Sequence, residues 1–349
     1  MITNKELSKL LGVSEATVSL VLNGKAGISE KTRKNVLERI RELGYGDAIG
    51  QKAWNSHQQS LETINGNIKN IAFVLYKVSG QLLGMNSFFP LIFDGIESTA
   101  RKYGYNLTVL TVNRENIQEG VSNIKASGCE GYVVFATEMQ AQDLFYFERL
   151  DLPFVLFDNF FAKSRINSVK VNNEQGIYTA VSYLRNLGHV HIGYLSSGLA
   201  INSFYERKRY TQCALEDEGL KLEDKYCFEI GYPSEIAETG MRKILEARKE
   251  LPTAFLCDND LVAIGAMQAV KKVGLRIPED IAFVGYDDRP ICELIEPGLT
   301  TIRLPRNIFG AAAVEKLISL IQQDDTWISK LEINGELIVR ESSAGKQDR

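Results

Sequence analysis

A short run near the N-terminus of the chain carries residues suited to binding a polyanion. Hydroxyl groups come from Ser14, Thr17 and Ser19, and Glu15 and Ala16 stand between the first two. Short side chains at the start of a helix let hydroxyl groups and backbone amides reach phosphate oxygens. The run therefore indicates DNA binding, although Ser14 and Thr17 could instead do no more than cap the helix.

The surrounding sequence predicts the helices that would present this run. Thr3 and Glu6 fit a capping box, which predicts a helix over residues 3–11, and Gly12 favours a tight turn. A second helix over residues 15–22 completes a helix-turn-helix, whose second helix is the one that enters the major groove. A third helix is expected over residues 29–43. Apolar residues at helical spacing predict a small core of Leu7, Leu10, Val18, Val21, Val36, Leu37, Ile40 and Leu43.

The sequence carries no set of residues typical of an enzyme. Residues 193–198 have the glycine spacing of a phosphate loop, but Leu199 and Ala200 stand where lysine and a hydroxyl residue would bind phosphate and magnesium. His189 and His191 could begin a metal site, but no cysteine or carboxylate completes it, which favours a structural role. We therefore expect no catalytic residue, no metal and no cofactor.

Composition divides the chain into a basic head and an acidic body. The 349 residues suit two or three domains, and 44% hydrophobic and 24% charged residues are typical of a soluble globular protein. Residues 1–45 contain eight lysines and arginines against five acids, so this segment carries +3 and the rest −7 of the total −4. Such a division fits one DNA-binding module attached to a part that does not touch DNA.

Signals for export or membrane insertion are missing from the sequence. The first residues lack the apolar core of a signal peptide, and no apolar run approaches transmembrane length. The five cysteines are odd in number and contain no C-x-x-C pair, which indicates reduced thiols. We expect a cytoplasmic protein with no membrane partner.

A linker separates the head from the body. Between residues 46 and 69 apolar periodicity disappears, while Gln, Asn, Ser and Gly accumulate. Over residues 70–349 short apolar runs alternate with amphipathic ones, which predicts an α/β fold with parallel sheets and ligands beyond the carboxyl ends of the strands. Strands are expected at 70–76, 107–112, 131–135, 154–157, 191–195, 227–230, 254–257 and 281–285. Helices are expected at 91–103, 118–126, 176–187, 206–218, 235–247, 261–273 and 308–322.

The first 45 residues resemble the DNA-binding headpiece of the lactose/purine repressor (LacI) family of bacterial transcription factors. The matching stretches are Gly12-Val-Ser14, Ala16-Thr-Val-Ser19, Val21-Leu-Asn23, Ser29-Glu-Lys-Thr-Arg33 and Glu42-Leu-Gly-Tyr45. Residues 70–339 resemble the effector-binding core of that family, with anchors at Asn86-Ser-Phe-Phe89, Gly188-His189, Asn259-Asp260, Ile277-Pro-Glu-Asp280, Val284-Gly-Tyr-Asp-Asp288 and Leu299-Thr-Thr-Ile302. The resemblance implies a three-helix headpiece joined to a two-lobed core like that of periplasmic binding proteins.

By this resemblance, Glu15, Ala16 and Leu20 occupy the base-reading positions. Glu15 could accept a hydrogen bond from a cytosine amino group, and Ala16 and Leu20 could contact thymine methyl groups. The family usually has arginine where Leu20 stands, which implies an unusual operator, unless Leu20 only packs inside the headpiece. Further DNA contacts are implied at Thr3, Ser14, Thr17, Ser19, Asn23, Lys31, Thr32 and Tyr45.

The resemblance also places an effector site at Phe88, Asp158, Arg207, Tyr232, Asn259 and Asp287. Aromatic rings stack on the apolar face of a polyhydroxylated ring, while carboxylates and guanidinium groups bind its hydroxyls. A sugar or sugar phosphate is therefore expected. A nucleobase is the alternative, because purine-type members of the family also stack an aromatic ring. Phe88 could instead belong to the core, and Asp260 and Asp288 are expected to cap helices or tie loops.

The function implied is that of a repressor of genes for sugar uptake or metabolism. A homodimer would bind double-stranded operator DNA, and a small ligand closing the cleft would shift the lobes and bias the linker. The alternative is a small-molecule receptor in which DNA binding is lost or secondary. DNA retention that falls steeply with salt would distinguish the two.

The linker departs most from the family pattern, which has Pro-Asn and then Ala-x-x-Leu forming a hinge helix whose leucine enters the minor groove. Here Tyr45 is followed by Gly46-Asp-Ala-Ile-Gly50, and ungapped alignment puts Trp54 at the position of that leucine. The two glycines weaken a helix by about 1 kcal/mol each. Trp54 either inserts between base steps or belongs to a flexible tether.

Overall fold

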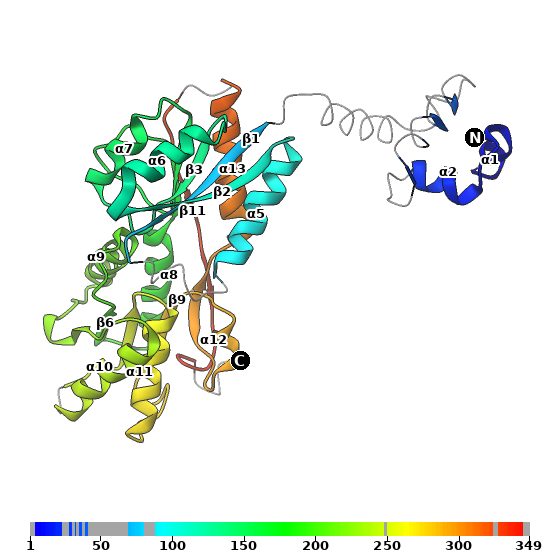
Figure 1. Cartoon of the computed structure of the whole chain (residues 1–349). Coiled ribbons are helices and arrows are strands. Elements are labelled where there is room, and N and C mark those ends of the chain that lie inside the picture. Colours follow the sequence, from blue (N-terminus) through cyan, green and yellow to red (C-terminus); the bar gives the residue numbers. More distant parts are fainter. Residues whose placement is uncertain are drawn as a thin grey trace. The chain divides into compact units, whose positions relative to one another are not determined.

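The structure is a computed structural model in which the chain forms two compact units, Met1–Ile68 and Lys69–Arg349 (Figure 1). It describes residues 4–22, 28–29, 32, 35–36, 39–40, 69–79, 88–247, 250–323 and 327–344, the side chains of residues 4, 22, 88 and 89 excepted. Several predicted contact residues lie outside the described residues: Thr3, Asn23, Lys31, Tyr45, Trp54 and the side chain of Phe88.

In the first unit, α1 (Asn4–Leu11) and α2 (Glu15–Leu22) form the predicted helix-turn-helix. Gly12 makes the turn possible because its φ of +68° lies in the left-handed region that side chains disfavour. Ser14 caps α2, since its Oγ accepts the Thr17 backbone amide at 3.1 Å. The described residues between 32 and 40 are helical, and Ser29 accepts the Thr32 amide in the same way.

A small apolar core holds the first unit together. Its described buried members are Leu7, Leu11, Val18, Val21, Val36 and Ile40. The prediction that Leu10 belongs to it is wrong, because this side chain is 49% exposed. Leu11 is buried instead, since residues four apart lie on one helix face and Leu11 follows Leu7 at that spacing. The predicted core residues Leu37 and Leu43 lie outside the described residues.

The second unit has two lobes, each built on a six-stranded sheet. The first sheet has the order β11-β5-β4-β3-β1-β2, with every pair parallel. Its strands are β1 (Asn70–Lys77), β2 (Asn106–Asn113), β3 (Tyr132–Phe135), β4 (Phe154–Phe157), β5 (Ser168–Val171) and β11 (Lys330–Ile333). The helices of this lobe are α5 (Phe88–Lys102), α6 (Ile117–Ala126), α7 (Leu144–Glu148) and α13 (Arg306–Ile321).

Both faces of this first sheet are covered. Along β1, Ile71 and Phe73 belong to the cluster that includes residues of α5 and α13, while Ala72 and Val74 belong to the cluster on the other face with α6 and α7. Strand side chains alternate between faces, so a strand buried on both sides reads as a continuous apolar run. The sequence of β1 has that character.

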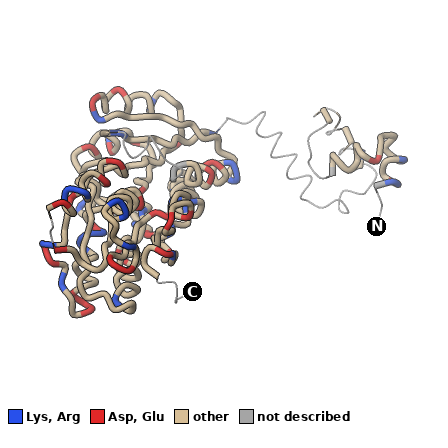
Figure 2. The backbone as a smooth tube through the Cα atoms, turned by 90° about the horizontal axis from the view of Figure 1, so that it is seen from below, with Lys and Arg blue, Asp and Glu red and all other residues tan. Residues whose placement is uncertain are grey.

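The second sheet has the order β12-β10-β9-β8-β6-β7, with β12 antiparallel to β10 and the other pairs parallel. Its strands are β6 (Ile192–Ser196), β7 (Cys227–Glu229), β8 (Ala254–Cys257), β9 (Ala282–Asp287), β10 (Thr300–Arg303) and β12 (Glu336–Ile338). The helices of this lobe are α8 (Asn173–Asn186), α9 (Asn202–Asp217), α10 (Ser234–Glu246), α11 (Asp260–Lys272) and α12 (Ile291–Leu294). Acidic and basic residues are interspersed over the described part of this unit (Figure 2).

The chain crosses between the lobes three times: from β5 to α8, from β10 to α13 and from β11 to β12 (Figure 1). Two of the crossings are tied together, because the Asn172 side chain donates to the Asn334 side chain at 2.9 Å. The backbone amide of Gly335 also donates to Gln175 at 3.1 Å. Short connections of this kind suit a hinge, where a few residues absorb the movement of two rigid lobes.

Candidate functional site

A narrow cavity lies between the two lobes, beyond the carboxyl ends of β3, β4, β8 and β9. The first lobe contributes Phe135, Thr137 and Asp158 to its lining, the second contributes Ile201, Ser203, Phe204, Arg207, Asn259, Asp287 and Arg289, and the crossing into α13 contributes Leu304. In open α/β sheets this edge is where ligands bind. The cavity is therefore the candidate ligand site of the second unit.

The structure brings four of the predicted effector residues to this cavity: Asp158, Arg207, Asn259 and Asp287. Asn259 has a second role, because its side chain caps α11 by accepting the Val262 amide at 3.1 Å. Tyr232 does not line the cavity. It is buried in the apolar cluster of the second lobe, and its hydroxyl has no hydrogen-bond partner among the described residues.

Arg207 is held rigidly from three sides. Its Nε donates to Asn173 at 3.0 Å, its Nη1 donates to the backbone carbonyl of Asp258 at 2.5 Å, and its Nη2 lies 3.5 Å from an Asp287 carboxylate oxygen. The guanidinium also lies over the Tyr286 ring, 3.6 Å from its centroid. A buried guanidinium needs such partners, because removing its charge from water is costly unless it is paired and hydrogen-bonded. The result is a fixed cation at the wall of the cavity.

Aspartates in unusual backbone conformations stand on both sides of the cavity. Asp158 follows β4 with a φ of +61°, and Asp287 ends β9 with a φ of +110°. Residues other than glycine pay about 1–3 kcal/mol for such a conformation, and these conformations cluster at functional sites. Around Asp287 the backbone is fixed by Arg306, whose Nη2 donates to the carbonyls of Asp287 and Asp288 at 2.5 Å each.

The Asp158 carboxyl is poised to change its charge near neutral pH. Burial raises the pKa of Asp158 to about 6, although the hydrogen bond from Thr137 and the positive charge of Arg207 act in the opposite direction. The Thr137 hydroxyl donates to this carboxylate at 2.5 Å. A carboxyl in this state can accept hydrogen bonds when ionised and donate one when protonated, and both suit the hydroxyl groups of a sugar.

Contacts between the lobes close the cavity. The Asn202 side chain at the start of α9 donates to Asn159 at 2.7 Å, and Lys170 lies 2.7 Å from Glu206. The cavity volume is about 50 Å³, which holds only a few water molecules. A sugar ring would therefore enter only when the lobes part, after which the same contacts could close over it.

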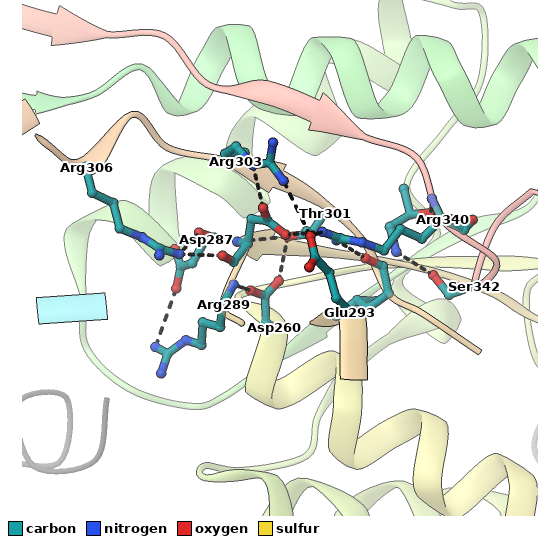
Figure 3. A network of polar contacts seen from close by, with 12 residues as sticks. Asp260, Asp287, Arg289, Glu293, Thr301, Arg303, Arg306, Arg340 and Ser342 are labelled. Carbon is teal, nitrogen blue, oxygen red and sulfur yellow. Dashed lines mark hydrogen bonds and ion pairs between the residues drawn. The ribbon is translucent and has the colours of Figure 1, made fainter. Parts of the chain in front are cut away.

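A second polar network lies behind the cavity at the end of the second sheet (Figure 3). Asp260 accepts the Thr301 hydroxyl at 2.5 Å and the Arg289 amide at 2.8 Å, and burial raises the pKa of its carboxyl to about 7. Asp288 lies 2.6 Å from Arg303 and 2.8 Å from Arg340. The prediction that Asp260 and Asp288 tie loops together is confirmed.

Several polar or aromatic lining residues were not predicted, among them Thr137, Ser203, Phe204 and Arg289. Ser203 and Phe204 lie four and three residues before Arg207, so they share its helix face, but the predicted start of this helix at residue 206 excluded them. Thr137 stands two residues beyond the end of β3. A polar residue just after a buried strand is the sequence feature that could have pointed to it. Arg289 directly follows the Asp287-Asp288 pair.

In the first unit, the predicted DNA-contacting residues lie around the start of α2. Ser14, Glu15 and Ala16 are exposed, whereas Leu20 is partly buried. Thr17 and Ser19 are also partly buried, and Thr32 is exposed. The exposed N-terminal turn of α2 leaves its backbone amides accessible to phosphate oxygens, as the helix-turn-helix docking mode requires.

The two histidines that could have begun a metal site have other partners. In the parts of the chain that are described, no three His, Cys, Asp or Glu residues are grouped so as to hold a metal ion. His189 contacts the Thr253 hydroxyl at 2.9 Å, and His191 lies 3.4 Å from Glu223, so each has a structural partner. No described helix combines the length and apolar character needed to cross a membrane.

Comparison with protein-family models matches both units. Residues 3–46 match the model described as bacterial regulatory proteins, lacI family, and residues 181–343 match a periplasmic binding protein-like domain. The chain carries a lacI-family DNA-binding domain followed by a periplasmic-binding-protein-like domain. It is a DNA-binding transcriptional regulator with a ligand-binding core, as the resemblance predicted.

Curated relatives match the chain along nearly its whole length. The repressor PurR of Vibrio vulnificus is 27% identical over 345 residues, 98% of each chain, and the probable repressor ExuR of Bacillus subtilis is 28% identical over 342 residues, again 98% of each. Among solved structures, the lac repressor dimer bound to operator and the anti-inducer ONPF has a TM-score of 0.71 and 25% identity, covering 99% of each chain. The cellobiose complex of the regulator CelR has the same TM-score at 23% identity, covering 98% of this chain and 100% of the other, and supports the fold alone.

Proposed function

We propose that this lacI-family regulator represses genes for sugar uptake or metabolism under the control of a small effector bound between its lobes. The observation that carries this proposal is the cavity in which Arg207 and Asp287 of the second lobe face Asp158 of the first. Charged groups from both lobes around one cavity suit a polyhydroxylated ligand, because its paired hydroxyls can bind carboxylates and guanidinium groups at the same time.

The effector acts on DNA binding through the movement of the lobes. Binding closes the cavity around the ligand, and the three crossings between the lobes absorb the rotation. In a homodimer, two headpieces bind the half-sites of a pseudo-palindromic operator, so a change in the relative position of the first lobes alters how well both can bind. The coupling is reciprocal, since an effector that changes operator affinity must have its own affinity changed by the operator.

On DNA, the second helix of the headpiece carries the specificity. Glu15, Ala16 and Leu20 face the base edges, while Ser14, Thr17 and Ser19 contact phosphates from the first turns of α2. The remaining contacts come from Thr3, Asn23, Lys31, Thr32 and Tyr45. Trp54 either inserts at the operator centre or belongs to a flexible tether, and we favour the tether because Gly46 and Gly50 weaken a helix at this stretch.

The effector is a sugar or a sugar derivative bound by Asp158, Arg207, Asn259 and Asp287. Phe88 stays a proposed contact, and Tyr232 could contact the ligand only if its side chain left the apolar cluster of the second lobe. One relative is the ribose operon repressor of Haemophilus influenzae, 26% identical over 344 residues. A nucleobase is the alternative effector, because purine-type members of the family also stack an aromatic ring. The proposed domains are a headpiece over residues 1–45, a linker over 46–69 and a core over 70–349.

The regulator works in the cytoplasm and has no enzymatic activity of its own in this proposal. A receptor that has lost its DNA-binding role is the second candidate, favoured only by the departure of the linker from the family pattern. DNA retention at 50 and 200 mM salt separates the two candidates, because each phosphate contact adds to the salt dependence of binding. Sequence-specific retention that falls by orders of magnitude supports the regulator, and absence of retention at both concentrations supports the receptor.

A further inference from the structure

Arg289 is a buried cation at the cavity with unused donors. Its side chain is 5% exposed, and its Nη2 lies 3.5 Å from an Asp287 carboxylate oxygen. Its Nε and Nη1, which carry three of the five N–H donors of a guanidinium, have no hydrogen-bond partner among the described residues. Buried donors that stay unpaired destabilise the folded protein, and charged donors do so more strongly. Such a group calls for a partner that the chain itself does not supply.

The neighbouring arginine shows the contrast. Arg207 has a partner at each of its three nitrogens. Among the described residues, the Arg289 guanidinium has one partner, Asp287, which it shares with Arg207. Figure 3 shows the guanidinium of Arg289 directed away from the network around Asp260, with its single dashed line running to Asp287. Arg289 also lines the cavity, and we infer that its unused donors, which other protein atoms cover in this arrangement, become accessible to a ligand when the lobes part.

We propose that Arg289 binds an anionic group of the effector, a carboxylate or a phosphate, and that the effector is therefore an acidic sugar. This inference rests on the proposed function and specifies the ligand class of the same site. Carboxylate and phosphate oxygens match the planar donor array of a guanidinium, and such charge-assisted hydrogen bonds are among the strongest in proteins. A neutral sugar hydroxyl would leave Nε and Nη1 of the buried Arg289 without a charged partner.

The other lining groups fix the orientation of such a ligand. Asp158 of the first lobe and Asn259 of the second offer oxygen acceptors to hydroxyl groups, and Phe135 and Phe204 offer apolar surface. The acid group of the sugar would then lie at the Arg289 end of the cavity, away from Asp158. The acid group would bind through Nε and Nη1, while Nη2 stays paired with Asp287. The positive charges of Arg207 and Arg289 offset the repulsion between this acid group and the Asp287 carboxylate.

Thermal shift and calorimetry on the full-length chain test the inference with matched pairs of probes. The pairs are glucose with glucuronate, glucose with gluconate, and glucose with glucose 6-phosphate, and adenine serves as the neutral nucleobase. Wild-type protein is compared with Arg289→Gln, with Arg289→Lys, and with the matched control Arg276→Gln. Arg276 is an exposed arginine of the same lobe whose side chain binds Asp280.

We expect at least one acidic probe to bind the wild type at least 10-fold more tightly than its neutral counterpart. The loss of a charge-assisted hydrogen bond should weaken that binding about 10- to 100-fold in Arg289→Gln, less in Arg289→Lys and not at all in Arg276→Gln. Comparing the affinity for the two sugar acids with the affinity for glucose 6-phosphate shows whether the site prefers a carboxylate or a phosphate. If Arg289→Gln fails to fold, the preference of the wild type for acidic over neutral probes still tests the inference.

Three results would overturn the inference. They are equal binding of acidic and neutral probes, failure of every acidic probe to bind the wild type, and unchanged affinity for the acidic probe in folded Arg289→Gln. A neutral sugar or adenine that binds and changes operator affinity would refute the acidic effector while supporting the proposed function. Absence of sequence-specific DNA retention would instead refute the proposed function, whatever the probes do.

Discussion

Replacing Asp158 by asparagine should remove a specific part of the pH dependence of stability. Burial raises the pKa of this carboxyl to about 6 in the folded protein, against 3.8 for an unperturbed aspartate. The folded state therefore binds a proton more tightly than the unfolded state between these two values. Stability rises as the pH falls through this window, and the side-chain amide that Asp158→Asn introduces cannot take part because it does not titrate.

The magnitude follows from the two pKa values. At pH 7 Asp158 is mostly ionised in both states and contributes almost nothing through proton binding. At pH 5 the folded carboxyl is mostly protonated while the unfolded one is mostly ionised, and the linkage relation gives about 1.3 kcal/mol of stabilisation. The Thr137 hydroxyl, which donates to Asp158, can still donate to the amide oxygen of the variant, so the local hydrogen bond is retained.

Urea unfolding of both proteins at pH 7 and pH 5 measures this difference. Circular dichroism reports the helices of the core, and the protomer concentration is kept fixed because association contributes to apparent stability. Other buried carboxyls such as Asp260 titrate in both proteins and cancel in the comparison. We compare the unfolding free energy of the wild type with that of Asp158→Asn at each pH. On lowering the pH from 7 to 5, the wild type should gain about 1.3 kcal/mol of stability relative to the variant. An unchanged difference would show that Asp158 keeps an ordinary pKa.

The other predictions concern the effector and the operator. Arg207→Ala and Asp287→Ala should each abolish the effector-induced change in operator affinity. Each should also lower the stability by about 3–5 kcal/mol, because it breaks a buried ion pair. An intact response in Arg207→Ala would exclude this arginine from the site. Leu20→Arg should favour guanine at the facing position by about 1–3 kcal/mol in binding-site selection, and identical preferences would mean that residue 20 does not face the bases. Trp54→Ala should leave DNA bending and affinity unchanged if the linker is a tether, whereas loss of both would establish insertion.

The apolar strands of the core could be predicted because burial leaves a clear pattern. Strands such as β3 and β8 are buried along their whole length and read as apolar runs. By contrast, β11 and β12 were missed, since their side chains are mostly exposed or half-buried at the edges of the two sheets. β10 was missed for the opposite reason: it is buried, but two of its residues are threonines whose hydroxyls bind Asp260 and the Arg340 carbonyl.

The site was predictable only in part. Strand-end position and family resemblance pointed to Asp158, Asn259 and Asp287, and the structure brings these residues to one cavity with Arg207. Nothing in the local sequence shows that the side chain of Arg289 turns into the cavity, or that Tyr232 lies in the core of the second lobe. These orientations are set by packing between elements that are distant in sequence, such as the α9 helix beginning at Asn202.

Calorimetric titration of the effector into the free protein and into the operator complex tests the central claim most directly. Glucuronate, or whichever probe binds in the panel above, is titrated at constant salt, and operator affinity is measured with and without the same probe. We predict that the operator changes effector affinity by the same factor by which the effector changes operator affinity, typically about 5- to 150-fold. Equal effector affinity in the free and operator-bound protein would show that the cavity does not control DNA binding.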